Sequence, residues 1–319
     1  MIVDLPDTTT SKVSKEVQSM REQGGVVALG RVLTLIVLTE EGQEEAAIDA
    51  ANLASREHPC RIIVLVEGDT SAETQLNAQI RVGGDAGASE VIVLHAQGSL
   101  CAQGDSLVAA LLLPDAPIVA WWPDRMPETA AQTDIGKIAH RRITDSANET
   151  APARALKTLS ENYHEGDTDL AWTRLTGWRV QLASALDQLD DLAEDPVRSV
   201  LVEGAADSPS TLLLAAWLQK SLQVPATVAE GAAGTGLHRV VLDRAAGPLE
   251  IHRPENDGNA TITQPGQPEQ RISLPRRSLQ DCLSEELRRL DPDEVFGETI
   301  VNELPELKHS SRSAEGGRG

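Results

Sequence analysis

The residues best suited to molecular recognition in this chain are tryptophans. The chain has five Trp but only one Phe and one Tyr, and four of the five Trp fall in two short segments. Trp121 and Trp122 are adjacent, whereas Trp172 and Trp178 share a segment with Arg174. Trp and Arg are enriched at the centres of protein interfaces. An Arg four residues before a Trp on a helix can stack on the indole, which contributes about 0.5–1 kcal/mol when exposed.

We therefore predict that these two segments contact a partner. The candidate interface residues are Trp121, Trp122, Asp169, Trp172, Arg174, Trp178 and Arg179. The competing interpretation is that the tryptophans pack domains of the chain together, and composition alone allows both interpretations.

The sequence offers little for catalysis or metal binding. His58 near Cys60 is the nearest approach to a nucleophile pair, but such strand-entry positions more often hold a loop residue and a core thiol. The His residues are isolated, with no HExxH motif, and no GxSxG nucleophile motif is present. Cys60, Cys101 and Cys282 are widely separated and form no CxxC pair, so neither a disulfide framework nor a zinc site is expected. We expect no catalytic residue and no metal site.

One glycine-rich stretch, Gly231 to Gly236, is the best candidate for a phosphate-binding loop. A dinucleotide loop must lead into a helix whose N-terminus holds the phosphate. Here the glycines lead into HRVVLD, which has the pattern of a strand. No GxxxxGK[ST] motif occurs either, so we expect no bound cofactor.

The charge balance narrows the class of partner. The 319 residues carry a formal net charge of −21, which repels phosphate backbones and anionic membrane surfaces. We therefore expect neither nucleic-acid nor membrane binding. No N-terminal segment has the pattern of a signal peptide, and no apolar run approaches the ~20 residues of a membrane span, so we expect a cytoplasmic protein.

The N-terminal half has the pattern of an α/β domain. A buried strand at 32–39, a helix at 40–57 and a strand at 61–66 make a βαβ unit with a right-handed crossover. Further strands are predicted at 76–82, 90–95, 116–122 and within 138–147, with a helix at 100–113. Trp121 and Trp122 end one of these strands, so they point to opposite faces and lie where open α/β sheets form their crevices.

The C-terminal half begins with helices. A polar helix at 151–166 and a long amphipathic helix at 168–193 precede a strand at 198–202 and a helix at 212–222. An antiparallel meander and two helices follow, at 226–274, 279–290 and 293–304. We predict two α/β domains, an N-terminal Rossmann-like mixed sheet and a C-terminal α/β unit with an antiparallel meander. The predicted parts are a flexible N-terminus (1–25), an N-terminal domain (26–165), a C-terminal domain (166–305) and a disordered tail (306–319).

Several stretches resemble a known family. They are DAPIVAWWP (115–123), RRITDSA (141–147), DLAWTRLTGWR (169–179), HPCRIIVL (58–65) and IRVGGDAGASEVIVL (80–94). They are similar to the OpcA family, the glucose-6-phosphate dehydrogenase assembly proteins of actinobacteria and cyanobacteria. The resemblance extends from about Val26 to Leu304.

The resemblance implies a non-catalytic partner that promotes the assembly or activity of glucose-6-phosphate dehydrogenase, the enzyme that opens the oxidative pentose phosphate pathway. It also implies an N-terminal and a C-terminal family domain. The cyanobacterial members are associated with thioredoxin-linked control, but the isolated cysteines here give no reason to expect a redox switch.

A second function from another class stays open. The α/β crevice suits a sugar-phosphate-binding enzyme or a metabolite sensor, with Arg141, Arg142 and Arg174 as candidate phosphate ligands.

Overall fold

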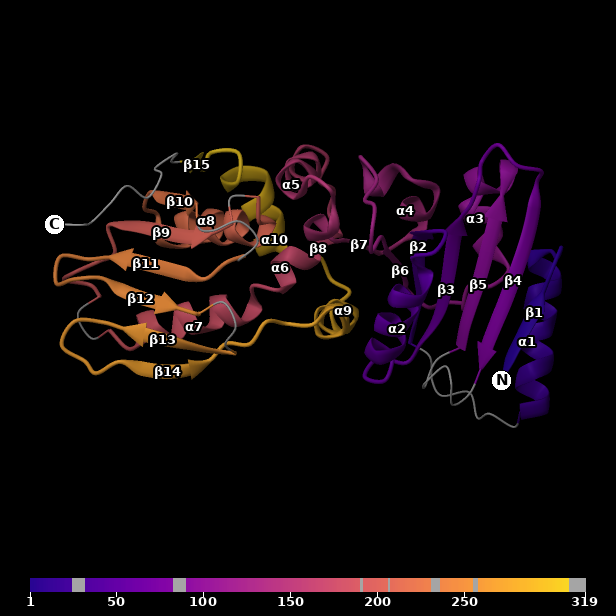
Figure 1. The fold of residues 1–319 in the computed structure, drawn as a ribbon, viewed down its shortest axis with the longest axis horizontal. Helices are drawn as coiled ribbons and strands as arrows, with labels where there is room; N and C mark the ends of the chain where they lie inside the picture. The colour runs from indigo at the N-terminus through magenta and orange to yellow at the C-terminus, as the bar shows by residue number, and fades with distance from the viewer. Residues whose placement is uncertain are drawn as a thin grey trace. The chain divides into compact units, whose positions relative to one another are not determined.

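Continuous apolar runs form the centre of the first sheet in the computed structural model of the chain (Figure 1). β2 (Leu33–Glu40), β3 (Cys60–Glu67) and β5 (Glu90–Gln97) are almost entirely buried. β3 pairs in parallel with β2 on one side and with β5 on the other. Strands that are apolar on both faces require helices on both sides of the sheet.

The structure describes residues 1–24, 32–82, 90–189, 192–205, 207–230, 236–254 and 258–309. The candidate phosphate loop, except for Gly236, and residues 310–319 of the predicted disordered tail lie outside these ranges. Within 306–309 the prediction of disorder is wrong, because Leu307 is buried and Lys308–His309 form a short strand. Within the described ranges, no helix is both long and apolar enough to cross a membrane.

The first sheet has eight strands in the order β1-β4-β5-β3-β2-β6-β7-β8. The strands not yet given are β1 (Ile2–Leu5), β4 (Gln75–Val82), β6 (Ile118–Trp121), β7 (Arg141–Thr144) and β8 (Asp167–Asp169). β6 pairs in parallel with β2 and β7, whereas β4 is antiparallel to β5 and β1 is antiparallel to β4. The predicted mixed Rossmann-like sheet is therefore confirmed.

Helices cover this sheet on both faces, as the right-handed crossover rule requires. The chain moves from β2 to β3 through α2 (Glu44–Ala54), and from β5 back across the sheet to β6 through α3 (Gly104–Ala109). These opposite directions put α2 and α3 on opposite faces. α1 (Thr10–Gly24), α3 and α4 (Asp134–Ile138) contribute to one core cluster. α9 (Leu279–Arg288) packs against α2.

The first residues of the chain are structured, which corrects the prediction of a flexible segment at 1–25. β1 adds a strand to the edge of the sheet, with Val3 opposite Ile80. α1 buries Val13, Val17 and Met20 in the core cluster. The polar stretch before these residues suggested a mobile terminus, but it contains the start of α1.

The second unit has a seven-stranded sheet in the order β14-β13-β12-β11-β9-β10-β15. Its strands are β9 (Ser199–Gly204), β10 (Ala226–Glu230), β11 (Arg239–Asp243), β12 (Leu249–His252), β13 (Asn259–Thr263), β14 (Gln270–Ser273) and β15 (Lys308–His309). β9 and β10 are parallel and are connected by α8 (Pro209–Leu222). The predicted antiparallel meander is confirmed for β11 to β14, but its first predicted strand, at 226–229, is β10 and does not belong to it. The fold class of two α/β domains is confirmed.

Among the remaining helices of this unit, those predicted at 151–166 and 168–193 are shorter than predicted, whereas the one predicted at 293–304 is helical over 294–303. The remaining helices are α5 (Pro152–Glu161), α6 (Leu170–Thr173), α7 (Thr176–Asp187) and α10 (Glu294–Glu298), which continues into a π-helical turn at Thr299–Glu303. The single helix predicted at 168–193 is thus two helices, with a break at Arg174 and Leu175.

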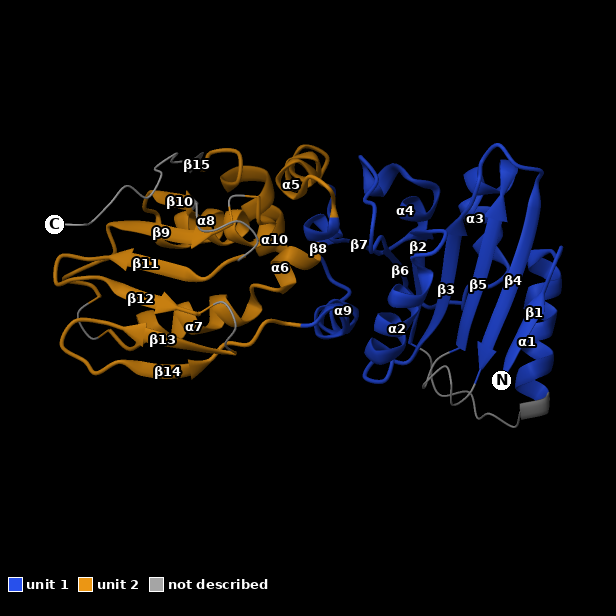
Figure 2. Ribbon diagram, in the orientation of Figure 1, with its two compact units in different colours: residues 1–148, 164–168, 278–292 blue, residues 149–163, 169–277, 293–319 orange. Residues whose placement is uncertain are grey.

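The chain passes between the two units more than once (Figure 2). The first unit consists of residues 1–148, 164–168 and 278–292, and the second consists of residues 149–163, 169–277 and 293–319. The predicted boundary at 165 is close to one of these crossings. It misassigns α5, which belongs to the second unit, and α9, which returns to the first. Sequence order cannot reveal such a return because α9 joins the first unit only through tertiary contacts.

Candidate functional site

A crevice lies at the carboxyl ends of the parallel strands in the first unit. β2 has β3 on one side and β6 on the other, and the crossovers from this centre go in opposite directions. Open α/β sheets form their ligand crevices at such a switch point. The cavity there has a volume of about 410 Å³, which is within the ~300–1,000 Å³ range of small-molecule sites.

The floor of this crevice is apolar and its rim is charged. Floor residues come from the strand ends and from α3 and α4, and include Leu38, Leu65, Leu107, Trp122 and Ile135. The charged residues in its lining are Glu40, Glu67, Arg125 and Asp134. Glu40 and Glu67 are the last residues of β2 and β3, so the sheet itself positions two of the three carboxylates.

The electrostatics of the rim are acidic. Two of the three rim carboxylates have a cationic partner. Arg125 Nη1 lies 3.1 Å from Glu40 Oε1, and Lys137 Nζ lies 3.6 Å from Asp134 Oδ1, so Glu67 gives the rim its excess negative charge. Next to Glu40, the Thr39 hydroxyl donates to Asp124 Oδ2 at 2.8 Å. The crevice therefore disfavours a phosphorylated ligand and favours a cation.

The first tryptophan segment contributes directly to this crevice. Trp121 is the last residue of β6 and is fully buried. Trp122 is 6% exposed, belongs to the core cluster and lines the crevice. The prediction that this strand end lies at the sheet's crevice is thus confirmed.

The second segment is organised around Trp172 in the second unit. Asp169 is buried and caps α6, because its Oδ1 accepts from the Ala171 amide at 2.9 Å. Trp172 is 1% exposed, and its Nε1 donates to Asp293 Oδ2 at 2.8 Å. The centroids of the Trp172 and Phe296 rings are 5.7 Å apart.

The predicted stacking of Arg174 on Trp178 is wrong. Cζ of Arg179 lies 3.8 Å from the ring centroid of Trp172, and Cζ of Arg253 lies 5.1 Å from that of Trp178. The helix breaks at Arg174, so the spacing of a continuous helix does not apply, and Arg253 from beyond β12 occupies the ring face. Sequence reasoning missed Arg253 because it comes from the distant meander.

The pKa of Arg253 is lowered to about 10, chiefly because burial disfavours its charge and secondarily because Arg276 is close. Its Nη1 and Nη2 donate to the carbonyls of Leu274 and Leu237 at 3.2 and 3.0 Å. This arginine therefore contributes to packing under Trp178 and ties meander loops together.

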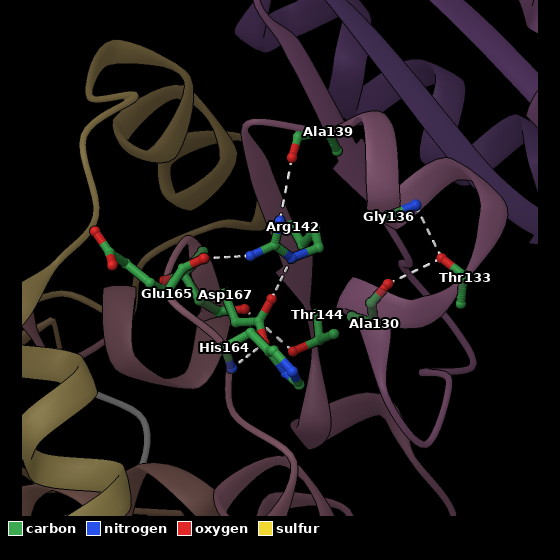
Figure 3. Close-up of polar contacts among 10 residues, drawn as sticks. Ala130, Thr133, Gly136, Ala139, Arg142, Thr144, His164, Glu165 and Asp167 are labelled. Carbon is green, nitrogen blue, oxygen red and sulfur yellow. Dashed lines mark hydrogen bonds and ion pairs between the residues drawn. The ribbon is translucent and has the colours of Figure 1, made fainter.

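Arg142, one of the arginines considered for phosphate binding, is instead buried in a network of its own unit (Figure 3). It forms an ion pair with Asp167 and donates to the carbonyls of Ala139, at 3.1 Å, and Glu165. Asp167 Oδ2 in turn accepts from the His164 amide at 2.8 Å. The guanidinium closes the turn before β8 and faces no crevice-lining residue in these contacts.

Arg141, the residue before Arg142 on β7, is also bound inside the first unit. It is 2% exposed, and its Nη2 donates to Glu286 Oε2 at 2.6 Å while Nη1 donates to the Asp291 carbonyl at 3.0 Å. These bonds hold the chain around α9 against β7. The motif RRITDSA therefore supplies structural ion pairs in the first unit.

No cluster suited to metal binding occurs in the described ranges, where three or more His, Cys, Asp or Glu side chains never converge on one point. Cys60 and Cys282 are buried free thiols, and Cys101 is a partly exposed free thiol in the crevice lining. The Cys101 thiol donates to the Ala96 carbonyl at 3.3 Å. The buried position of Cys60 at the start of β3 agrees with a core thiol.

Two family models match the chain. Residues 51–161 match the model that describes the N-terminal domain of the glucose-6-phosphate dehydrogenase subunit. Residues 165–300 match the model that describes the C-terminal domain of the same subunit. No curated protein matches the chain.

Proposed function

Because the chain belongs to the OpcA family of glucose-6-phosphate dehydrogenase assembly proteins, we propose that it is a non-catalytic factor that binds this dehydrogenase. Binding would stabilise the dehydrogenase's native oligomer by mass action, or bias it toward an active conformation. The observation that most directly supports this proposal is that both domain models of the family match the chain, one after the other.

The candidate phosphate ligands and the crevice of the first unit fit a protein that binds a partner better than one that binds a sugar phosphate. Two of the three arginines considered for phosphate recognition, Arg141 and Arg142, form hydrogen bonds and ion pairs inside the first unit. The crevice at the switch point has an acidic rim. Both observations argue against the alternative of a sugar-phosphate enzyme or sensor.

We infer that the second tryptophan segment contributes its arginines, rather than its indoles, to the contact with the dehydrogenase. Trp172 and Trp178 are buried, whereas Arg174 and Arg179 are partly exposed. Stacking on the Trp172 ring holds the Arg179 side chain in place, which reduces the entropy that binding would cost.

The function is tested with purified dehydrogenase. Its activity and its oligomer size are measured with and without this protein, at micromolar concentrations. We expect a change in at least one, together with a stable complex. No change in either, with no complex, would remove the proposed function.

The contact is tested with Arg174→Ala. We expect it to weaken dehydrogenase binding and to leave the thermal unfolding temperature nearly unchanged. The matched control is Arg198→Ala, which removes the same charge at an exposed position before β9. Equal binding by both variants would exclude Arg174 from the interface. Trp172→Ala should lower the unfolding temperature whichever surface binds, because its ring is core.

A further inference from the structure

The crevice of the first unit combines an apolar floor, made by the edges of core side chains, with a rim that has more carboxylates than cations. Its floor is built from Leu38, Leu65, Leu107 and Trp122. At its mouth, Glu40 is paired with Arg125 and Asp134 with Lys137, which leaves Glu67, among the described lining residues, as the carboxylate to meet a cationic ligand. A ligand that matches both features must have an apolar body and a cationic end.

Lysine and arginine side chains have this construction. Each has an aliphatic stem that packs on apolar surface and a charged head that stays near water. In the crevice the stem would lie on the Trp122 and Leu107 floor, and the head would reach Glu67 at the end of β3. Glu67 is exposed, so the head would remain partly hydrated there.

We propose that this crevice receives a lysine or arginine side chain from the surface of the dehydrogenase. The proposal rests on the proposed function and adds the chemistry by which the first tryptophan segment takes part in binding. Trp122 then contributes as the floor of the crevice, which is consistent with its small exposed fraction of 6%.

Charge complementarity favours a protein as the occupant over a free small cation. The rim carboxylates are largely solvated; Glu40 and its partner Arg125 have side chains 54% and 79% exposed. Exposed ion pairs contribute only about 0–1 kcal/mol, so a small cation would gain little by itself. A basic protein surface gains the surrounding contacts as well, and the formal charge of −21 attracts it during association.

The test compares dehydrogenase binding by three charge-reversal variants. Glu67→Lys and the double variant Glu40→Lys/Glu67→Lys change the rim. Glu16→Lys makes the same charge change at a partly exposed position on α1, which does not line the crevice. We expect Kd to rise about tenfold for Glu67→Lys and further for the double variant, and to change less than about twofold for Glu16→Lys.

Cys101 gives a second measurement that needs no substitution in the rim. It is partly exposed in the crevice lining, whereas Cys60 and Cys282 are buried. N-Ethylmaleimide labelling of Cys101, read by mass spectrometry, should slow at least fivefold when dehydrogenase is bound. Spermidine, a small polyamine, should not reproduce this protection at the same concentration.

The outcomes separate the proposal from the proposed function. If wild-type protein binds and the rim variants bind as tightly as Glu16→Lys, with Cys101 unprotected, the crevice proposal is overturned and the assembly function stands. If wild-type protein does not bind the dehydrogenase, both fail. Protection by spermidine alone would overturn the choice of a protein side chain as occupant.

Discussion

Asp293 has two structural tasks in the second unit, and its replacement should be unusually costly for a partly exposed residue. Its Oδ1 accepts from the Phe296 amide at 2.9 Å and so caps α10. Its Oδ2 accepts from the buried Trp172 Nε1 at 2.8 Å. Asp293→Ala removes both acceptors.

The magnitude follows from the two losses. Removal of an N-cap costs about 1 kcal/mol, and a buried indole N–H without an acceptor costs about 1–3 kcal/mol. Asp293→Ala should therefore destabilise the second unit by about 2–4 kcal/mol. Asp293→Asn keeps one oxygen, which can still cap α10, but its amide NH2 then faces the indole N–H. Asp293→Asn should therefore recover only the capping contribution and cost about 1–3 kcal/mol.

Urea unfolding of both variants, followed by tryptophan fluorescence, measures the difference. A double-mutant cycle with Trp172→Phe isolates the indole contribution, and a coupling of about 1–2 kcal/mol is expected for these contacting residues. Equal stability of Asp293→Ala and Asp293→Asn, within about 0.5 kcal/mol, would refute the reasoning.

Three further predictions concern stability and pH. Glu90→Ala should destabilise the first unit by about 3–5 kcal/mol in urea unfolding, because the buried Glu90 carboxylate binds two arginines; less than about 1 kcal/mol would contradict this. Gly98→Ala should cost more than Gly42→Ala in thermal unfolding, since both have positive φ but an added Cβ meets backbone atoms within 3 Å only at Gly98; equal costs would exclude the clash. Hydrogen bonds from Arg239 are the chief cause of the lowered pKa of Glu250. The folding stability that ionised Glu250 contributes is therefore fully present above pH 4.5, its ordinary pKa, and is lost as pH falls through the lowered pKa. Glu250→Gln should therefore flatten the acid side of the stability profile by about 0.5–1 kcal/mol, and an unchanged profile would contradict it.

The sequence predicts the first sheet well for a physical reason. Strands buried on both faces must be apolar throughout, so β2, β3 and β5 appear as continuous apolar runs. Glu40 and Glu67 end two of these runs, and this position was a signal for the rim of the crevice that the sequence predictions did not use. Asp134 carried no such signal, because it reaches the crevice from the start of a short helix that follows a separate loop.

Local sequence patterns could not predict features that depend on contacts between residues far apart in the chain. The segment around Trp172 has good helix formers, yet the helix breaks at Arg174, where Trp172 is bound to Asp293 and packed on Phe296. These partners lie more than 100 residues further along the chain. The strand β1 was missed because it has only four residues and is half exposed.

The central claim is that this chain forms a complex with glucose-6-phosphate dehydrogenase. Sedimentation velocity of the purified dehydrogenase, alone and with a twofold excess of this protein, tests it directly. We expect a faster-sedimenting species that contains both proteins, and we expect this species to be lost when Glu40→Lys, Glu67→Lys and Arg174→Ala are combined. Two unchanged, independent boundaries at micromolar concentrations would contradict the central claim.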